Sequence, residues 1–170
     1  MADIPTILFD HRRALGIGAA GEHLVCADLL LAGYPAFLAG QGSPYDIALD
    51  LNGRLVRLTV KSVVGPRRRA GRMMAREEYI FVIGRTKRDH RGKTTRRAYS
   101  TNDVDLVALV ALDIKAIAYL PMSACPTGLN FLAPHGAPSA NKFGPKNRPR
   151  LLFSDHSLSA ALQAMENAGG

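Results

Sequence analysis

The order of hydrophobic and polar residues predicts a helix followed by a run of strands. Residues 18–32 are apolar on nearly every side, which predicts a helix that is buried on more than one face and ends before Gly33. Residues 45–51 and 55–63 alternate between apolar and polar positions on either side of Asn52-Gly53. This arrangement predicts a tight β-hairpin.

Shorter apolar runs predict the remaining strands, at 36–38 and 79–84 and in a second hairpin formed by 104–112 and 116–120. The run 104–112 fits a helix equally well, because its alanines and leucines suit either period. Residues 125–149 are rich in proline, glycine and asparagine and have no regular pattern, so we expect a long loop there.

The C-terminal residues predict a final helix, capped by Ser154, with an apolar face made of Leu158, Ala161, Leu162 and Met165. The order of helix, strands and helix favours an α/β or α+β sheet fold. We expect a single domain over residues 1–170, with a basic, loop-rich segment at 123–150 before the terminal helix.

The composition is that of a globular domain. The chain has 170 residues, of which 47% are hydrophobic and 21% charged, and this excludes wholesale disorder. We expect no membrane-spanning run and no signal peptide. Two cysteines far apart in the sequence, Cys26 and Cys125, favour a reducing compartment, so a cytoplasmic location is expected.

The positive charge is concentrated in three segments that are predicted to be loops. The net charge is +8, and sixteen of the 22 lysines and arginines lie in 67–76, 85–97 and 142–150. Such side chains bind phosphate oxygens, so nucleic acid is the favoured partner, although a solvated basic surface would have the same composition. A membrane surface is disfavoured because these segments lack an apolar face. The predicted nucleic-acid-binding residues are Arg67, Arg68, Arg69, Arg72, Arg76, Lys87, Arg88, Arg91, Lys93, Arg96 and Arg97.

Three ionisable residues lie in apolar surroundings: Glu22, Asp46 and Lys61. The register of the first hairpin places Asp46 opposite residues 59–61, and Thr59 shares a face with Lys61. Carboxylates on a rigid hairpin suit Mg²⁺, and a nearby lysine can position water or offset charge on phosphorus. Each residue also has an ordinary alternative role, at a turn, at a strand end or in a first helical turn.

These residues form a pattern that resembles the PD-(D/E)xK nuclease superfamily. The resemblance rests on Gly21-Glu22 in a helix, then Pro44-Tyr45-Asp46, a hairpin, and Thr59-Val60-Lys61. The downstream residues Tyr99, Asp103, Asp105 and 118–121 are similar to its group I intron-associated and Holliday-junction-resolvase-like branches.

The resemblance implies a restriction-endonuclease-like mixed central β-sheet flanked by helices, and cleavage of DNA phosphodiesters with Mg²⁺ (or Mn²⁺). It implies that Asp46 and Glu22 are metal ligands and that Lys61 is the catalytic lysine. Thr59 departs from the family pattern, which usually has Glu, Asp or Gln there. Either Glu22 supplies the second carboxylate, or one metal is bound weakly, or catalysis has been lost. Gln41 is a further polar candidate.

The expected function is therefore a Mg²⁺-dependent endonuclease acting on DNA. The alternative is a catalytically impaired nucleic-acid-binding module on the same fold. A homodimer or a higher homo-oligomer is expected for the enzyme, because one site cuts one strand.

Other motifs favour structural roles. The run 16–21 matches GxGxxG, but it lacks the preceding strand that a dinucleotide site needs. The five histidines lack the spacing of a zinc site. Asp103 and Asp105 are interpreted as turn or strand-start residues. The tyrosines at 79, 99 and 119 and Phe81 are interpreted as strand core residues.

Overall fold

The structure is a computed structural model of the whole chain. It describes residues 11–40, 42–68, 77–88, 94–132 and 151–168, with the backbone alone at 11, 12, 68, 85–88, 94–97 and 132. The helices are α1 (His11–Leu31) and α2 (Leu158–Ala168), with short 3-10 turns η1 (Met122–Ala124) and η2 (Phe153–Asp155). The strands are β1 (Ala36–Leu38), β2 (Ile47–Leu51), β3 (Arg54–Val63), β4 (Arg67–Arg68), β5 (Glu77–Val82), β6 (Arg85–Arg88), β7 (Thr94–Arg97), β8 (Leu106–Ala111), β9 (Ala116–Pro121) and β10 (Gly128–Leu132).

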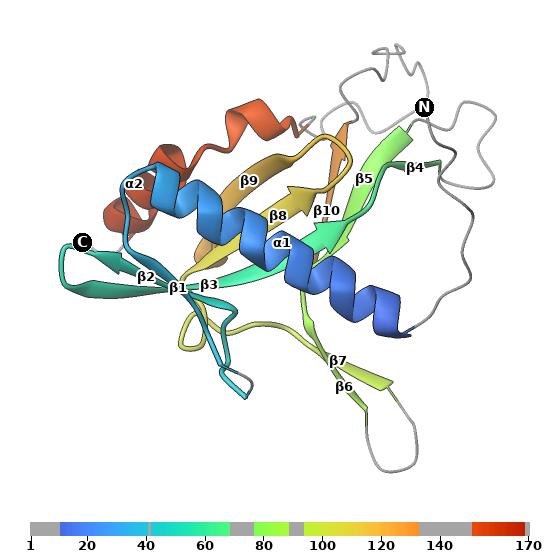
Figure 1. Cartoon of the computed structure of the whole chain (residues 1–170), viewed down its shortest axis with the longest axis horizontal. Helices are drawn as coiled ribbons and strands as arrows, with labels where there is room; N and C mark the ends of the chain where they lie inside the picture. The colour runs from blue at the N-terminus through green and yellow to red at the C-terminus, as the bar shows by residue number, and fades with distance from the viewer. Residues whose placement is uncertain (1–10, 41, 69–76, 89–93, 133–150, 169–170) are drawn as a thin grey trace.

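The central sheet is mixed, as expected, with the order β1-β2-β3-β8-β9 (Figure 1). β3 and β8 are parallel, and the other neighbours are antiparallel. The run that fitted either a helix or a strand is the strand β8, in which every residue is buried. A strand covered on both faces has no polar side, which explains why its sequence does not alternate.

The predicted Asn52-Gly53 hairpin is confirmed as the connection between β2 and β3. Asn52 and Gly53 both have positive φ, at 55° and 85°, which the favoured two-residue turn requires. Ile47 pairs with Leu58. One residue further along, Asp46 therefore stands opposite Thr59, as the register predicts.

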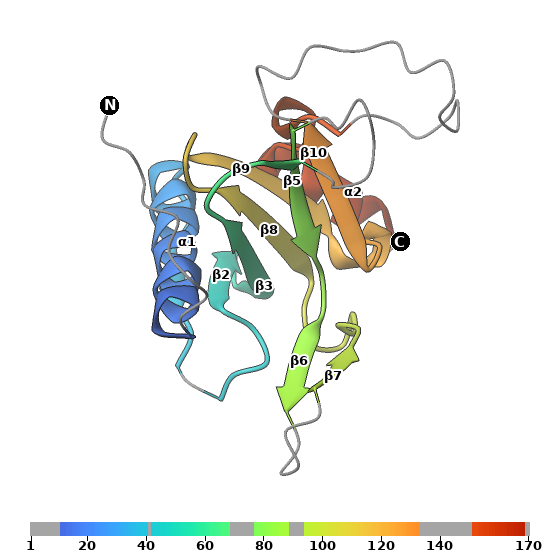
Figure 2. The same cartoon turned by 90° about the vertical axis from the view of Figure 1, so that its right-hand side faces the viewer.

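Helix α1 covers one face of the sheet (Figure 2), and its side chains Val25 and Leu29 are fully buried there. The expectation that the helix is buried on more than one face is wrong, because Leu15, Leu30 and Leu31 are exposed. The helix starts at His11 rather than at residue 18, because two glycines lower helix propensity by only about 1 kcal/mol each and do not stop it. The GxGxxG run therefore lies inside a helix, without the strand-to-helix turn of a dinucleotide site. At the other end Gly33, with φ of 87°, terminates α1 as predicted.

The other face of the sheet is covered by a second, three-stranded sheet with the order β10-β5-β4 (Figure 2). Tyr79, Phe81 and Phe131 are buried between the two sheets, with Phe153 packed against them. The prediction of an irregular stretch at 125–149 is wrong for its first part, because residues 128–132 pair with β5. Two of the three basic segments are likewise not simple loops, since 67–76 contains β4 and 85–97 contains β6 and β7. The third, 142–150, lies outside the described residues.

Helix α2 packs beside β9 and buries Ala161 and Leu162, with Leu158 and Met165 partly buried against the same core. This face is the predicted one. The predicted cap is wrong: Ser154 lies in η2, and Ser157 Oγ accepts the hydrogen bond from the Ala160 N–H. Ser154 and Ser157 could each cap a helix, but η2 occupies 153–155, so α2 begins after Ser157.

The expectation of no run long enough to span a membrane is also corrected. Residues 13–31 are long and apolar enough to do so by length and composition. One such helix is weak evidence for a membrane span, and α1 packs on the sheet here.

Candidate active site

Asp46 is held rigidly at the point where β2 begins. Its backbone N–H donates to the Leu58 carbonyl at 2.8 Å, and its own carbonyl accepts from the Ala39 N–H at 2.9 Å. The backbone pairing of β2 with β3 ends at Leu58, and beyond it the Asp46 side chain accepts hydrogen bonds from β3. Its Oδ2 accepts the Val60 N–H at 2.7 Å and lies 2.8 Å from Thr59 Oγ1.

The structure brings Thr59 and Lys61 together through Tyr99. Tyr99 OH lies 3.0 Å from Thr59 Oγ1 and 2.8 Å from Lys61 Nζ. Within the described ranges Thr59 is the one polar side chain classed as buried, with no exposed surface. A continuous chain of hydrogen bonds therefore joins the ammonium of Lys61 to the carboxylate of Asp46.

Glu22 approaches the same place from α1. Burial raises the pKa of its carboxyl, and the negative charge of Asp46 raises it further, while His23 and Lys61 lower it. The two carboxylates are therefore close enough to repel each other. Thus the structure groups Glu22 and Asp46 with Lys61 and Thr59.

Gly21 allows α1 to approach β3 at this point. A Cβ at Gly21 would lie 1.7 Å from Ser62 Oγ, so any other residue would push the helix away from the strand. Because Glu22 is the next residue, the close contact at Gly21 also sets how near its carboxylate lies to Asp46.

The donor set fits a hard divalent cation. Mg²⁺ takes one or two carboxylates and keeps several waters, and Glu22 and Asp46 supply two carboxylates with mutual repulsion that a cation would relieve. Among the described residues, two donors contact Asp46 Oδ2 and none is found at Oδ1, which could accept a ligand. No group of three or more His, Cys, Asp or Glu residues suited to a metal occurs in the described parts of the chain.

Strands β6 and β7 form a separate two-stranded ribbon that projects from the body of the molecule (Figures 1 and 2). In its register Arg85 stands opposite Arg97, and Thr86 opposite Arg96. Of the predicted nucleic-acid-binding residues, Lys87, Arg88, Arg96 and Arg97 lie on this ribbon.

The first basic segment has a different setting. Arg67 and Arg68 form β4, in register with Glu78 and Glu77 of β5. The remaining predicted binding residues, together with the candidate Gln41, lie outside the described residues: Arg69, Arg72, Arg76, Arg91 and Lys93.

The sequence does not predict the contact of Tyr99 with the site, and its interpretation as a strand core residue is wrong. Tyr99 lies instead in the connection between β7 and β8, and its hydroxyl reaches the side chains at the end of β3. A tyrosine between a basic segment and an aspartate pair gave no periodic signal. Only the fold brings it 38 residues back along the chain to Lys61.

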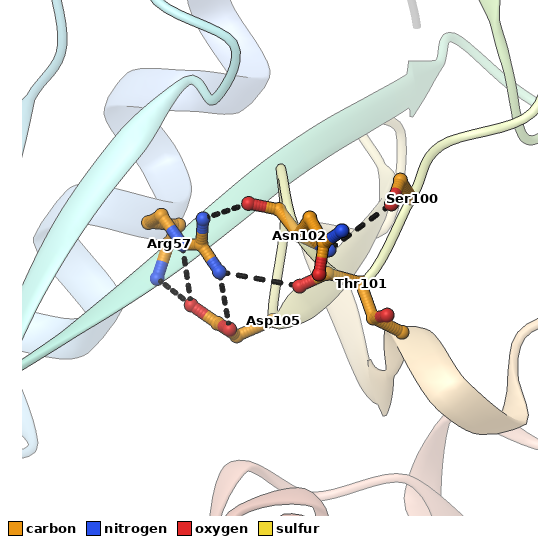
Figure 3. Close-up of polar contacts among 5 residues, drawn as sticks. All are labelled: Arg57, Ser100, Thr101, Asn102 and Asp105. Atoms are coloured by element: carbon orange, nitrogen blue, oxygen red, sulfur yellow. Dashed lines mark hydrogen bonds and ion pairs between the residues drawn. The ribbon is translucent and has the colours of Figure 1, made fainter.

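The connection that carries Tyr99 is fastened to β3 by Arg57 (Figure 3). The guanidinium donates to both carboxylate oxygens of Asp105 at 2.8–2.9 Å and to the carbonyls of Thr101 and Asn102. Burial opposes ionisation of Asp105, but the hydrogen bonds from Arg57 outweigh it and lower the pKa of that carboxyl. Asp105 is thus a structural residue just before β8, in agreement with its interpretation from the sequence.

Comparisons with known proteins identify the family and support the fold. The family model of the PD-(D/E)XK endonucleases matches residues 14–131, and the chain belongs to this family. Among solved structures, the chain is similar to the bacterial homing endonuclease I-Ssp6803I, with a TM-score of 0.61 and 16% sequence identity over 91% of this chain and 95% of that one. At that identity the likeness is one of fold. No curated protein sequence matches the chain.

Proposed function

We propose that this protein is a Mg²⁺-dependent endonuclease that hydrolyses phosphodiester bonds of DNA. The observation that carries the proposal is the hydrogen-bonded chain Asp46–Thr59–Tyr99–Lys61 beside the raised-pKa carboxyl of Glu22. Membership of an endonuclease family supports the reaction class.

Each residue has a task in this proposal. Asp46 and Glu22 hold the cation, which when bound would polarise the phosphate and help to ionise water. The ammonium of Lys61 lies on the same site, where it orients the attacking water and offsets negative charge that develops on the phosphate oxygens. Thr59 contributes a hydroxyl that fixes the orientation of the Asp46 carboxylate.

The ribbon β6–β7 is the favoured DNA contact. Arginines directly opposite each other repel and destabilise an isolated two-stranded ribbon, and bound phosphates would relieve this repulsion. Arg67 and Arg68 are instead in register with glutamates of β5. The connection from β1 to β2, which ends at Asp46, lies at the same end of the molecule as the ribbon (Figures 1 and 2). DNA bound to the ribbon would therefore lie near Asp46.

The alternative is a nucleic-acid-binding module that no longer cleaves. Thr59 favours this alternative, because a buried hydroxyl replaces the carboxylate or amide that the family usually has at this position.

A plasmid-nicking assay tests the proposal. We expect the wild-type chain to nick supercoiled DNA with Mg²⁺ or Mn²⁺, and Asp46→Asn and Lys61→Met to reduce the rate by at least about 100-fold. Asp155→Asn, an exposed carboxylate on η2, is the matched control and should cleave normally. DNA binding by the wild type without metal-dependent nicking would establish the binding module instead.

We also propose a cytoplasmic homodimer. The free cysteines Cys26 and Cys125 are consistent with a reducing compartment, and two sites are needed to cut two strands. Light scattering of the purified chain should give twice the monomer mass of 18.3 kDa, and a higher multiple would indicate a larger assembly.

A further inference from the structure

We propose that Tyr99 is a positioning residue of the proposed nuclease site, which holds the ammonium of Lys61 and the hydroxyl of Thr59 in place of a second carboxylate on β3. This inference rests on the proposed function. It assigns a role to a residue that lies outside the three segments Gly21-Glu22, Pro44-Tyr45-Asp46 and Thr59-Val60-Lys61.

The direction of the hydrogen bonds supports this role. A lysine ammonium has protons and no acceptor, so Lys61 must donate to the phenol oxygen of Tyr99 at 2.8 Å. Thr59 has a single proton and a charged acceptor in Asp46 at 2.8 Å, which leaves its oxygen to accept the proton of Tyr99. Each of the three hydrogen bonds then has one donor and one acceptor, and the chain runs from a cation to an anion.

Tyr99 also opposes a competing arrangement. Lys61 has a flexible stem, and its ammonium interacts with the charge of Glu22 in a site where Asp46 supplies a second carboxylate. An ammonium drawn onto those carboxylates would occupy the place of the cation. The bond to Tyr99 keeps Lys61 beside the carboxylates and off them, so both can bind metal.

The position of Tyr99 is itself fixed from two sides. It follows the ribbon strand β7 by two residues, and Arg57 holds the next turn through Thr101, Asn102 and Asp105 (Figure 3). A phenol on such an anchored connection is a more rigid partner than the end of a free loop.

The test is Tyr99→Phe, which keeps the ring that lies 5.1 Å from Lys61 Nζ and removes only the hydroxyl. We expect single-turnover cleavage to slow by about 10- to 100-fold, with DNA affinity in Ca²⁺ and the melting temperature nearly unchanged. Tyr79→Phe is the matched control, because that hydroxyl bonds to Asp113 instead and its loss should leave the rate unchanged.

Two further readouts separate positioning from a general structural effect. In a Lys61→Met background, Tyr99→Phe should change the residual rate by less than about twofold, because the phenol acts through Lys61. In protein with ¹³C-labelled tyrosine Cζ, the resonance missing from Tyr99→Phe should shift in Lys61→Met, whereas the Tyr79 resonance should not.

The outcomes are distinguishable. Wild-type cleavage with an equally fast Tyr99→Phe variant overturns this inference and leaves the proposed function intact. The inference is also overturned if Tyr99→Phe slows cleavage by the same factor in the Lys61→Met background as in the wild type. It is overturned as well if the Tyr99 resonance does not shift in Lys61→Met. A wild-type chain that never cleaves overturns the proposed function and this inference together.

Discussion

Glu22 ionises at a cost in this fold, because burial and the charge of Asp46 both raise the pKa of its carboxyl. A raised pKa means that the folded state favours the protonated acid. The stabilisation from the protonated form is complete below the ordinary glutamate pKa of about 4.3 and is lost as the pH rises through the higher folded-state pKa. At neutral pH without metal, the charged carboxylate therefore destabilises the fold.

Glu22→Gln should consequently raise the melting temperature at pH 7 in metal-free buffer, by about 1–3 °C, while abolishing cleavage. The stability difference should shrink as the pH falls toward 4. Added Mg²⁺ should stabilise the wild type more than the variant, because the proposed site loses one of its two carboxylate ligands. Calorimetry at several pH values measures all three effects.

The matched control is Glu166→Gln, which removes an exposed glutamate from α2 and should show neither effect. A Glu22→Gln variant that melts below the wild type at pH 7 would contradict the assigned electrostatics. If Mg²⁺ stabilised Glu22→Gln as much as the wild type, Glu22 would be excluded as a ligand.

The close approach of Gly21 to Ser62 leads to a second prediction. Gly21→Ala places a methyl group 1.7 Å from Ser62 Oγ, so the helix must shift, and the free energy of unfolding should fall by about 1–3 kcal/mol. Ser62→Ala should recover part of this loss, because it removes the atom in the way. Urea unfolding monitored by circular dichroism provides the measurement.

Gly16→Ala is the matched control within the same helix. Nothing lies within 4 Å of the added atom, so alanine should stabilise α1 by up to about 1 kcal/mol. Equal effects of the two substitutions would show that helix propensity, and not the contact with β3, determines the response at Gly21.

At the scale of elements, the Arg57–Asp105 pair connects β3 to the segment that carries Tyr99. Asp105→Asn should lower the free energy of unfolding by about 1–3 kcal/mol at pH 7 and should slow cleavage, because Tyr99 loses its anchor. The pKa of Asp105 is lowered, so its stabilisation is present above the ordinary aspartate pKa and is lost as the pH falls through the lower folded-state value. Urea unfolding at pH 7 and near pH 2 measures the effect.

The gap between variant and wild type should close at the acid end. Asp155→Asn is again the exposed control, with no expected change at either pH. A destabilisation of Asp105→Asn that persists unchanged at pH 2 would show that lost packing, rather than the ion pair, is responsible.

The elements that the sequence predicted are those with local causes. The hairpin at Asn52-Gly53 depends on two residues that tolerate positive φ, and its register then places Asp46 opposite Thr59. The end of α1 at Gly33 is equally local. For these features, neighbouring residues alone carry the information.

The elements that were missed depend on distant partners. β10 pairs with β5 across a long stretch of chain, and Tyr99 reaches the site through a fold in which Arg57 and Asp105 are 48 residues apart. No spacing rule connects such positions. The strands of the basic ribbon are not predicted, because their sequences contain only polar and charged residues and so lack the apolar alternation of a strand.

At the scale of the whole molecule, the net charge of +8 is not spread evenly over the described elements. The cations of β4 stand in register with glutamates, whereas those of β6 and β7 face arginine or threonine. The ribbon therefore concentrates lysines and arginines at one end of the molecule, near the connection that leads into β2 (Figure 1). This asymmetry predicts where the salt dependence of DNA binding originates.

Lys87→Thr combined with Arg96→Thr tests this location without disturbing the ribbon. Each substitution creates a threonine pair, with Thr95 or Thr86, and such pairs favour strand formation. Each lost phosphate contact should reduce the slope of log affinity against log salt by about 0.9, so the double variant should lose about 2. Affinity measured by fluorescence anisotropy over a salt series gives this slope.

The control is Lys115→Gln, in the β8–β9 turn at the opposite end of the molecule from the ribbon (Figures 1 and 2). It removes one cation as well but should leave the slope unchanged, because a screened charge that far from DNA releases no counterion. Equal slopes for the control and the ribbon variant would mean that net charge, and not the ribbon, attracts DNA. A smaller slope for the ribbon variant alone, with slower cleavage at high salt and normal cleavage at saturating DNA, would assign the ribbon to binding and leave the chemistry to Asp46, Glu22 and Lys61.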